Sequence, residues 1–84
     1  MQTKYEKKTK LCWMNPRDID IPSLFIEKGC NEWKIEERID YYNKYGSFDK
    51  PIEVSRKGYC TDGYSRLCAA LWIDLDKVLV AQYI

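Results

Sequence analysis

The segment Asp62-Gly63-Tyr64-Ser65-Arg66 combines residue types that can hold a phosphate group at the start of a helix. The pattern of the chain predicts a helix that begins at Tyr64, and the first N–H groups of a helix lack an intrahelical partner and attract anions. Gly63 has no Cβ to keep a phosphate away from the backbone, and Ser65 adds a hydroxyl donor. Arg66 can close on a phosphate with two parallel hydrogen bonds, and Asp62 can cap the helix. The segment therefore predicts a phosphate-binding turn.

A structural interpretation of the same segment remains open. Asp-Gly before a helix is an ordinary turn and N-cap, and Arg66 could pair with Asp62 or with a carboxylate elsewhere in the fold. Tyr64 stands beside the turn, where it could lie over the base or sugar of a ligand or pack against Tyr59 of the preceding strand. The local residues alone do not decide between these interpretations.

The composition limits the chemistry that the chain can perform. The 84 residues suffice for one domain with a modest core, and 14 basic against 13 acidic residues give a net charge of +1. Such a balance argues against a protein that coats nucleic acid by charge alone. The chain contains no His, which removes the usual general base, the catalytic triad and most catalytic zinc sites. Asp62, Asp74 and Asp76 could suggest a magnesium site, but the last two fit a solvated turn better, and we expect no metal site.

The cysteines and the apolar runs indicate where the protein resides. None of the four cysteines forms a C-x-x-C pair, so a zinc ribbon or a thioredoxin-like motif is not expected. The first ten residues are polar and basic, unlike a signal peptide, and no apolar run approaches the length of a membrane span. We therefore expect a cytoplasmic protein with reduced cysteines and no membrane contact.

The N-terminal part of the chain predicts a polar lead-in and an extended stretch. Residues 1–9 are expected to form a flexible basic segment, and residues 10–84 are expected to form a single domain. Residues 19–21 alternate between apolar and polar side chains, as a half-buried strand does. We expect residues 23–26 to continue this extended stretch.

The clearest helix in the sequence covers residues 32–45. Asn31 is suited to cap its N-terminus, and Gly46 is suited to a left-handed C-cap. Three apolar residues fall on one face at helical spacing, namely Ile35, Ile39 and Tyr42. The pattern predicts an amphipathic helix that packs with this face inward.

The second half of the chain predicts a hairpin, a second helix and a last strand. Residues 51–55 alternate as a strand, residues 56–58 form a tight turn, and residues 59–61 return as the partner strand. A helix is predicted from Tyr64 to Trp72, and residues 78–81 are apolar enough for an interior strand. The three tryptophans are expected in the core and not as stacking platforms: Trp13, Trp33 and Trp72.

The order of these elements resembles the ParB/sulfiredoxin superfamily over residues 17–84, most clearly over residues 51–80. A Pro-Ile-x-Val strand, a hairpin, a Gly63-x-x-Arg66 turn followed by Ala69-Ala70, and a final strand occur in the family's order. The resemblance implies an α+β domain in which a mixed β-sheet carries a β-hairpin and two main helices. It also implies that the Gly-x-x-Arg turn binds the phosphates of a nucleotide, with a nucleoside triphosphate and Mg²⁺ as a candidate cofactor.

The resemblance adds one candidate residue and removes some activities. Members of the superfamily include CTP-binding partition proteins, ATP-using sulfinic acid reductases and a free-serine kinase. Asn15-Pro16-Arg17 resembles an N-terminal segment of the partition proteins in which an arginine faces the same pocket, so Arg17 joins the candidates. Tyr64 replaces the nucleophilic Cys of sulfiredoxins and a Glu of the partition proteins, so sulfinic acid reduction is not expected and nucleotide hydrolysis is in doubt. The chain has no room for the helix-turn-helix domain of partition proteins, and we expect no sequence-specific DNA binding by this chain alone.

Three functional hypotheses follow from the sequence. The first is a regulatory module that binds a nucleotide or another phosphate ligand at Asp62–Arg66 without catalysis. The second is a metal-dependent nucleotide hydrolase, phosphotransferase or nuclease, for which Asp62 is the one obvious carboxylate. The third is a degenerate protein–protein interaction module of a mobile element or phage, with a protein partner or self-association.

Overall fold

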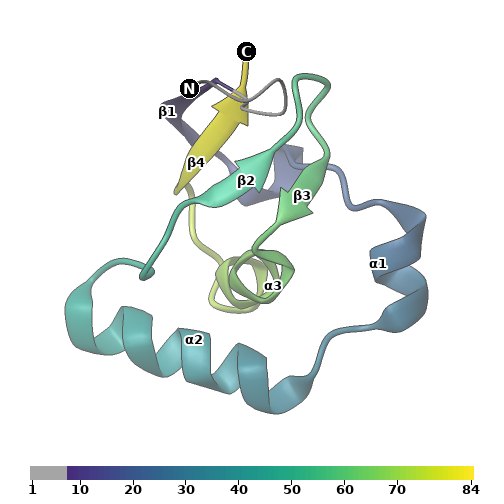
Figure 1. The fold of residues 1–84 in the computed structure, drawn as a ribbon. Coiled ribbons are helices and arrows are strands. Elements are labelled where there is room, and N and C mark those ends of the chain that lie inside the picture. The colour runs from purple at the N-terminus through teal and green to yellow at the C-terminus, as the bar shows by residue number, and fades with distance from the viewer. Residues whose placement is uncertain (1–7) are drawn as a thin grey trace, which may run out of the picture.

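A computed structural model describes residues 8–84, and its centre is a mixed four-stranded β-sheet (Figure 1). The strand order is β1-β4-β2-β3, so that the last strand of the chain lies in the interior of the sheet. β4 is antiparallel to β1 and parallel to β2, and β2 and β3 form the predicted antiparallel hairpin. The bounds are β1 (Thr9–Met14), β2 (Ile52–Val54), β3 (Cys60–Asp62) and β4 (Val78–Tyr83).

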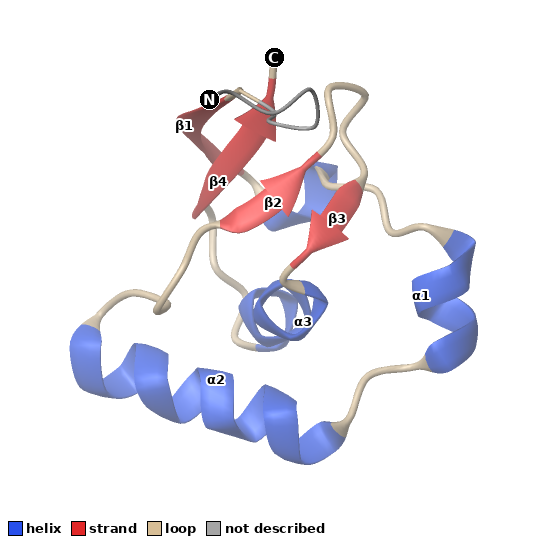
Figure 2. Ribbon diagram, viewed as in Figure 1, coloured by secondary structure: helices blue, strands red, loops and turns tan. Residues whose placement is uncertain are grey.

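The helices lie below, behind and beside this sheet in the view of Figure 2. They are a short 3-10 helix η1 (Pro16–Asp18), α1 (Ser23–Lys28), α2 (Glu32–Tyr45) and α3 (Tyr64–Trp72). α3 contacts both β2 and α2, and it therefore lies between the sheet and α2. The architecture is the small α+β domain that the sequence predicts, with a mixed sheet, a hairpin and two main helices. Within residues 8–84, no helix is long and apolar enough to cross a membrane.

The long helix α2 has the bounds and caps that its sequence predicts. The Asn31 side chain accepts a hydrogen bond from the backbone N–H of Trp33 at 3.2 Å. Gly46 ends the helix in the left-handed conformation, with φ of 76°, and its N–H donates to the carbonyl of Tyr42 at 2.7 Å. The predicted inward face is partly buried. The N-terminus of α2 is thus capped by a side chain, and its C-terminus is capped by the backbone of a glycine.

The core lies between α3 and the inward side of the sheet. Leu67 and Ala70 of α3 pack with strand residues that alternate inward, and the cluster consists of Ile19, Ile52, Val54, Cys60, Leu67, Ala70, Val78 and Val80. The prediction that the tryptophans belong to this core is wrong, because Trp13, Trp33 and Trp72 are 61%, 57% and 77% exposed. Strand alternation places Trp13 on the opposite side of the sheet from the core residues Val78 and Val80. Small residues such as Ala70 let α3 approach the sheet closely, which leaves little room for large rings.

The segment after Ile21 differs from its prediction. Residues 23–26 belong to the helix α1 and not to an extended stretch, since the N–H groups of Phe25 and Ile26 donate to the carbonyl of Pro22 at 2.9 and 3.3 Å. Two helical turns are too short to show a clear 3.6-residue pattern. Residues 19–21 contribute an isolated bridge, Asp20 to Tyr59, in place of a regular strand.

The predicted basic N-terminal segment falls mostly outside the described residues. Residues 1–7 lie beyond them. Thr9, which the sequence analysis assigned to the lead-in, is the first residue of β1. The Lys8 carbonyl accepts a hydrogen bond from the N–H of Ile84 at 3.1 Å, which continues the pairing of β1 with β4.

Candidate functional site

The predicted phosphate-binding turn joins the end of β3 to the start of α3 through a single residue, Gly63. Gly63 has φ of 87°, in the left-handed region, and its carbonyl accepts the N–H of Leu67 at 3.0 Å as the first bond of the helix. A Cβ at this position would lie 3.1 Å from Nη1 of Arg66 and 3.4 Å from Cα of Ile52. Glycine is therefore needed for both the backbone conformation and the close packing on β2. The expected N-cap by Asp62 is absent, because α3 has no side-chain cap and Gly63 occupies the N-cap position.

Arg66 is buried and bound to a carboxylate from a distant segment. Its Nε donates to Oδ1 of Asp49 at 2.9 Å, and its Nη2 donates to Oδ2 at 3.4 Å. This two-fold hydrogen bond lowers the pKa of the Asp49 carboxyl below its ordinary value, against a smaller opposing effect of burial. Arg66 is thus held in place beneath the turn, as the structural interpretation of the sequence allowed. The Nη1 atom of Arg66 donates neither of these two hydrogen bonds and lies close to Gly63.

A second arginine, Arg38 of α2, faces the turn directly. Its Nε donates to Oγ of Ser65 at 3.3 Å, and its Nη1 lies 3.9 Å from Oδ2 of Asp49. Arg38 and Arg66 therefore share the Asp49 carboxylate, and Oε1 of the exposed Glu37 lies 4.0 Å from the same Nη1 of Arg38. The sequence analysis missed both Arg38 and Asp49. A signal for Arg38 existed, because it lies three residues after Ile35, on the face of α2 that is otherwise apolar.

These residues surround a hollow of about 770 Å³, which we call the basic recess. Five cationic side chains line it, from α1, α2, α3 and the segment before β2: Lys28, Lys34, Arg38, Lys50 and Arg66. Asp62, Gly63, Tyr64 and Ser65 also line it. Within the described part of the chain, Asp62 is the one acidic residue among its lining residues. A hollow with this charge attracts anions that carry more than one negative charge.

Tyr64 lines the basic recess, but its ring is already packed. It stacks on Phe25 of α1 with ring centroids 5.3 Å apart and planes 28° apart, a partner that differs from Tyr59, which was one of the two possibilities left open by the sequence. Burial raises the pKa of the Tyr64 hydroxyl to about 12, and a hydrogen bond with Cys68 contributes. Burial likewise raises the pKa of the Cys60 and Cys68 thiols to about 11. Both thiols and the phenol are therefore neutral at pH 7 and poor nucleophiles.

Arg17 lies at the other end of α3. It forms an ion pair with Asp74, and its Nη1 donates to the carbonyl of Leu75 at 3.3 Å, in the turn between α3 and β4. The structure thus brings Asp62, Gly63, Tyr64, Ser65 and Arg66 to the basic recess and does not bring Arg17 there. Among residues 8–84, no three His, Cys, Asp or Glu side chains gather in a way that could hold a metal ion.

The arrangement defines a class of small α+β domains in which a hairpin leads through a Gly-x-x-Arg turn into a helix beneath a mixed sheet. Solved structures share the overall fold of this chain. It superposes on a Pnob8-like ParB-N domain with a TM-score of 0.77 at 15% identity over 93% of this chain. It superposes on sulfiredoxin from Arabidopsis thaliana with a TM-score of 0.75 at 20% identity over 87% of this chain and 83% of that one. The chain therefore has a ParB/sulfiredoxin-like fold, as its motifs indicated.

The comparisons extend to the fold and no further. A second structure of a pNOB8-like ParB N-domain gives a TM-score of 0.72 at 15% identity over 99% of this chain. The chain spans 31% and 30% of the length of the two ParB N-domain chains that it matches. No family profile and no curated protein matches the sequence.

Proposed function

We propose that the domain is a regulatory binding module that holds a multiply charged phosphate ligand, of which a nucleotide is the leading class, in the basic recess. One observation carries this proposal. Five cationic side chains and the start of α3 face the same hollow, while Asp62 is the one acidic residue of the described chain that lines it. The first N–H groups of α3 add partial positive charge at the same place.

Each part of the basic recess has a definite role in this proposal. The backbone N–H groups from Gly63 to Arg66 and the Ser65 hydroxyl donate to phosphate oxygens. The Ser65 oxygen already accepts a hydrogen bond from Arg38, so its proton is free to point at the ligand. Lys34 and Arg38 neutralise charge from the α2 side, and the ion pair with Asp49 holds Arg66 beneath the turn. A nucleoside triphosphate with Mg²⁺ fits this charge, with Asp62 as the residue that would face the metal.

Binding without chemistry is favoured by the state of the side chains near the turn. Tyr64 stands where sulfiredoxins carry a nucleophile, and it is neutral and stacked on Phe25. The Asp49 carboxylate is occupied by Arg66. The hydrolase, phosphotransferase or nuclease alternative therefore depends on Asp62 alone among these residues. Magnesium-dependent phosphate release that Asp62→Asn abolishes would establish that alternative instead.

Calorimetric titration with CTP, ATP and inorganic tripolyphosphate, with and without Mg²⁺, tests the proposal. Lys34→Met and Arg38→Met should each weaken binding about threefold to tenfold, since each removes one charge that faces the ligand. Lys57→Met is the matched control, because Lys57 is exposed on the hairpin turn and outside the basic recess. Binding should also weaken as salt is raised. The proposal fails if none of the ligands binds at millimolar concentration, or if Lys34→Met and Arg38→Met bind as Lys57→Met does.

A protein-interaction role is the second candidate, because three tryptophans are more than half exposed. Exposed rings of this size are enriched at protein interfaces. Sedimentation or light scattering over a range of protein concentrations would detect self-association. A mass that stays monomeric at high concentration would leave only a different protein as partner.

A further inference from the structure

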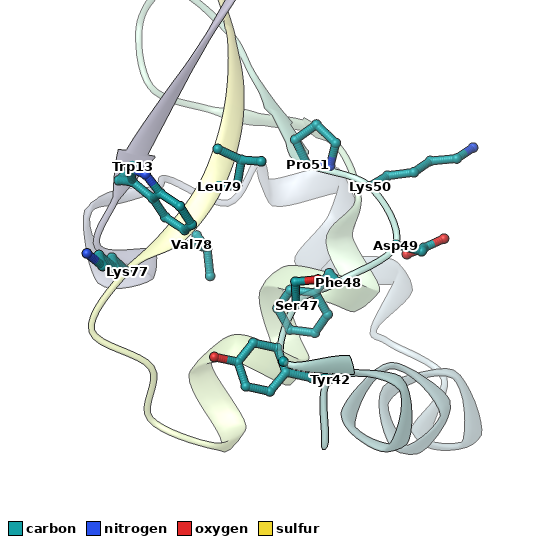
Figure 3. Close-up of a pocket in the computed structure, with 11 residues that line it drawn as sticks. Trp13, Tyr42, Ser47, Phe48, Asp49, Lys50, Pro51, Lys77, Val78 and Leu79 are labelled. Carbon is teal, nitrogen blue, oxygen red and sulfur yellow. The ribbon is translucent and has the colours of Figure 1, made fainter. Parts of the chain in front are cut away.

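A second hollow, of about 330 Å³, lies between the β1–β4 pair and the C-terminal end of α2 (Figure 3). We call it the aromatic recess; its main lining residues are Trp13, Tyr42, Phe48, Pro51, Lys77 and Leu79. It shares only Lys50 with the lining of the basic recess among the described residues. The proposed phosphate site uses none of the other residues that line it.

Two groups of side chains flank the aromatic recess on opposite sides. Trp13 of β1 and Leu79 of β4 are direct partners in the strand register and form the wall on the sheet side. Tyr42 and Phe48 form the opposite wall, with ring centroids 5.1 Å apart and planes 46° apart. Walls built from aromatic and branched apolar side chains favour a planar apolar ring between them. The exposed face of Trp13 would be covered by such a ring.

The polar groups of the aromatic recess favour an anion. The Lys77 Nζ lies 5.3 Å from the centre of the Trp13 ring. In Figure 3 the Lys77 amino group and the Tyr42 hydroxyl lie on the left side of the recess, and the Asp49 carboxylate and the Lys50 amino group lie on its right side. The Asp49 carboxylate is in any case bound to Arg66. The polar groups on the Lys77 side of the recess are therefore one ammonium, the Tyr42 hydroxyl and the indole N–H of Trp13, all of which can donate hydrogen bonds.

We propose that the aromatic recess binds a small molecule with one planar aromatic ring system and one carboxylate. Two lysines and one carboxylate line the recess, Lys50, Lys77 and Asp49, so its net charge matches a single negative charge, in contrast to the five cations of the basic recess. The volume is at the lower end of ligand pockets, which span about 300–1,000 Å³, and it fits one ring system. The ring lies between Trp13 and Phe48, and the carboxylate accepts from Lys77 and Tyr42.

Three naphthalene probes of the same shape test this proposal by NMR on the ¹⁵N-labelled protein: 2-naphthoate, 2-naphthalenemethanol and 2-naphthylmethylamine. The indole N–H signal of Trp13 reports on the recess, and those of Trp33 and Trp72, which do not line it, are internal controls. We expect a saturable shift of Trp13 with 2-naphthoate, about fivefold tighter binding than the alcohol, and weaker binding of the amine. Lys77→Met should abolish the preference for 2-naphthoate over the alcohol.

Two further variants separate the aromatic recess from the rest of the protein. Trp13→Ala removes one wall and should abolish binding of all three probes, with the backbone amide signals of Phe48 and Leu79 as the readout. Arg38→Met, which affects the basic recess, should leave 2-naphthoate binding unchanged. Equal shifts of all three indole signals would mean general adsorption and would overturn the proposal. The proposal is also overturned if the indole signal of Trp13 shows no saturable shift, or if Lys77→Met keeps the preference for 2-naphthoate over the alcohol. The Lys77→Met result remains decisive even if Trp13→Ala fails to fold.

Discussion

Replacement of Asp49 by Asn should destabilise the domain at neutral pH, because it leaves a buried guanidinium without its counter-charge. The Asp49 carboxylate accepts two hydrogen bonds from Arg66, whose side chain is 8% exposed, while the Asp49 side chain is 30% exposed. Loss of one partner of a fully buried ion pair costs about 3–5 kcal/mol. Water that reaches Asp49 screens part of this interaction. We therefore expect a loss of about 2–3 kcal/mol, out of roughly 4–13 kcal/mol for a domain of this size.

The same ion pair predicts the direction of a pH effect. The hydrogen bonds from Arg66 lower the pKa of the Asp49 carboxyl from its ordinary value of 3.8. A carboxyl with a lower pKa in the folded protein stabilises it above the unfolded-state pKa, and the contribution disappears as the pH falls through the folded-state pKa. The free energy of unfolding of the wild type should therefore decrease below about pH 4, and Asp49→Asn should lack that part of the decrease.

Urea unfolding followed by circular dichroism at pH 7 and pH 3 measures both effects. Asp76→Asn is the matched control, because Asp76 is exposed in the turn before β4. The double variant Asp49→Asn/Arg66→Met removes both charges and should recover part of the lost stability. The reasoning is refuted if Asp49→Asn and Asp76→Asn have the same free energy of unfolding at pH 7 and the same dependence on pH.

Four other variants test three single features of the structure. Gly63→Ala should cost about 2–3 kcal/mol and Gly58→Ala about 1 kcal/mol in urea unfolding, because both have positive φ but only a Cβ at Gly63 meets neighbouring atoms within 4 Å. Tyr64→Phe should remove a tyrosine that ionises near pH 12 in a spectrophotometric titration, and an unchanged titration curve would contradict the assignment. Because the pKa of Tyr64 is 10.0 in the unfolded state and about 12 in the folded protein, the free energy of unfolding of the wild type should decrease as the pH rises between these two values. Arg17→Met should lower the free energy of unfolding by less than about 1 kcal/mol, because the side chains of the ion pair, Arg17 and Asp74, are 47% and 79% exposed. It should leave the affinity for the phosphate ligand unchanged in calorimetry. A marked loss of affinity in Arg17→Met would place this residue in the site after all.

The elements that the sequence predicted well are those with strong local signals. α2 has an Asn N-cap, an amphipathic face and a C-terminal Gly, and α3 follows directly after the Gly63 turn. The hairpin of β2 and β3 has alternating strands around a tight turn. Each of these patterns extends over enough residues to exclude other structures. The helix α1 has only six residues and no buried side chain, so its pattern did not distinguish it from a strand.

Of the candidate site, only the residues that are adjacent in the sequence could be predicted. Gly63 to Arg66 could be found because the turn and the helix start are adjacent in the chain. The partners that decide how Arg66 behaves come from elsewhere: Asp49 is 17 residues away from Arg66, and Arg38 is 27 residues away from Ser65. The sequence shows that Arg66 needs a partner, but the tertiary packing of α2 against α3 selects which carboxylate it meets. The exposure of the tryptophans likewise depends on how closely α3 approaches the sheet.

The interior position of β4 has a consequence for the order in which the protein can assemble. β1 pairs only with β4 within the described chain, and Thr9 and its partner Tyr83 stand at opposite ends of the sequence. During synthesis on the ribosome, β1 can therefore pair with β4 only after Val78 to Tyr83 have emerged. The hairpin and α3 can form earlier, because their contacts are local. A chain interrupted before Val78 would lack the strand that joins β1 to β2, so the four-stranded sheet could not form.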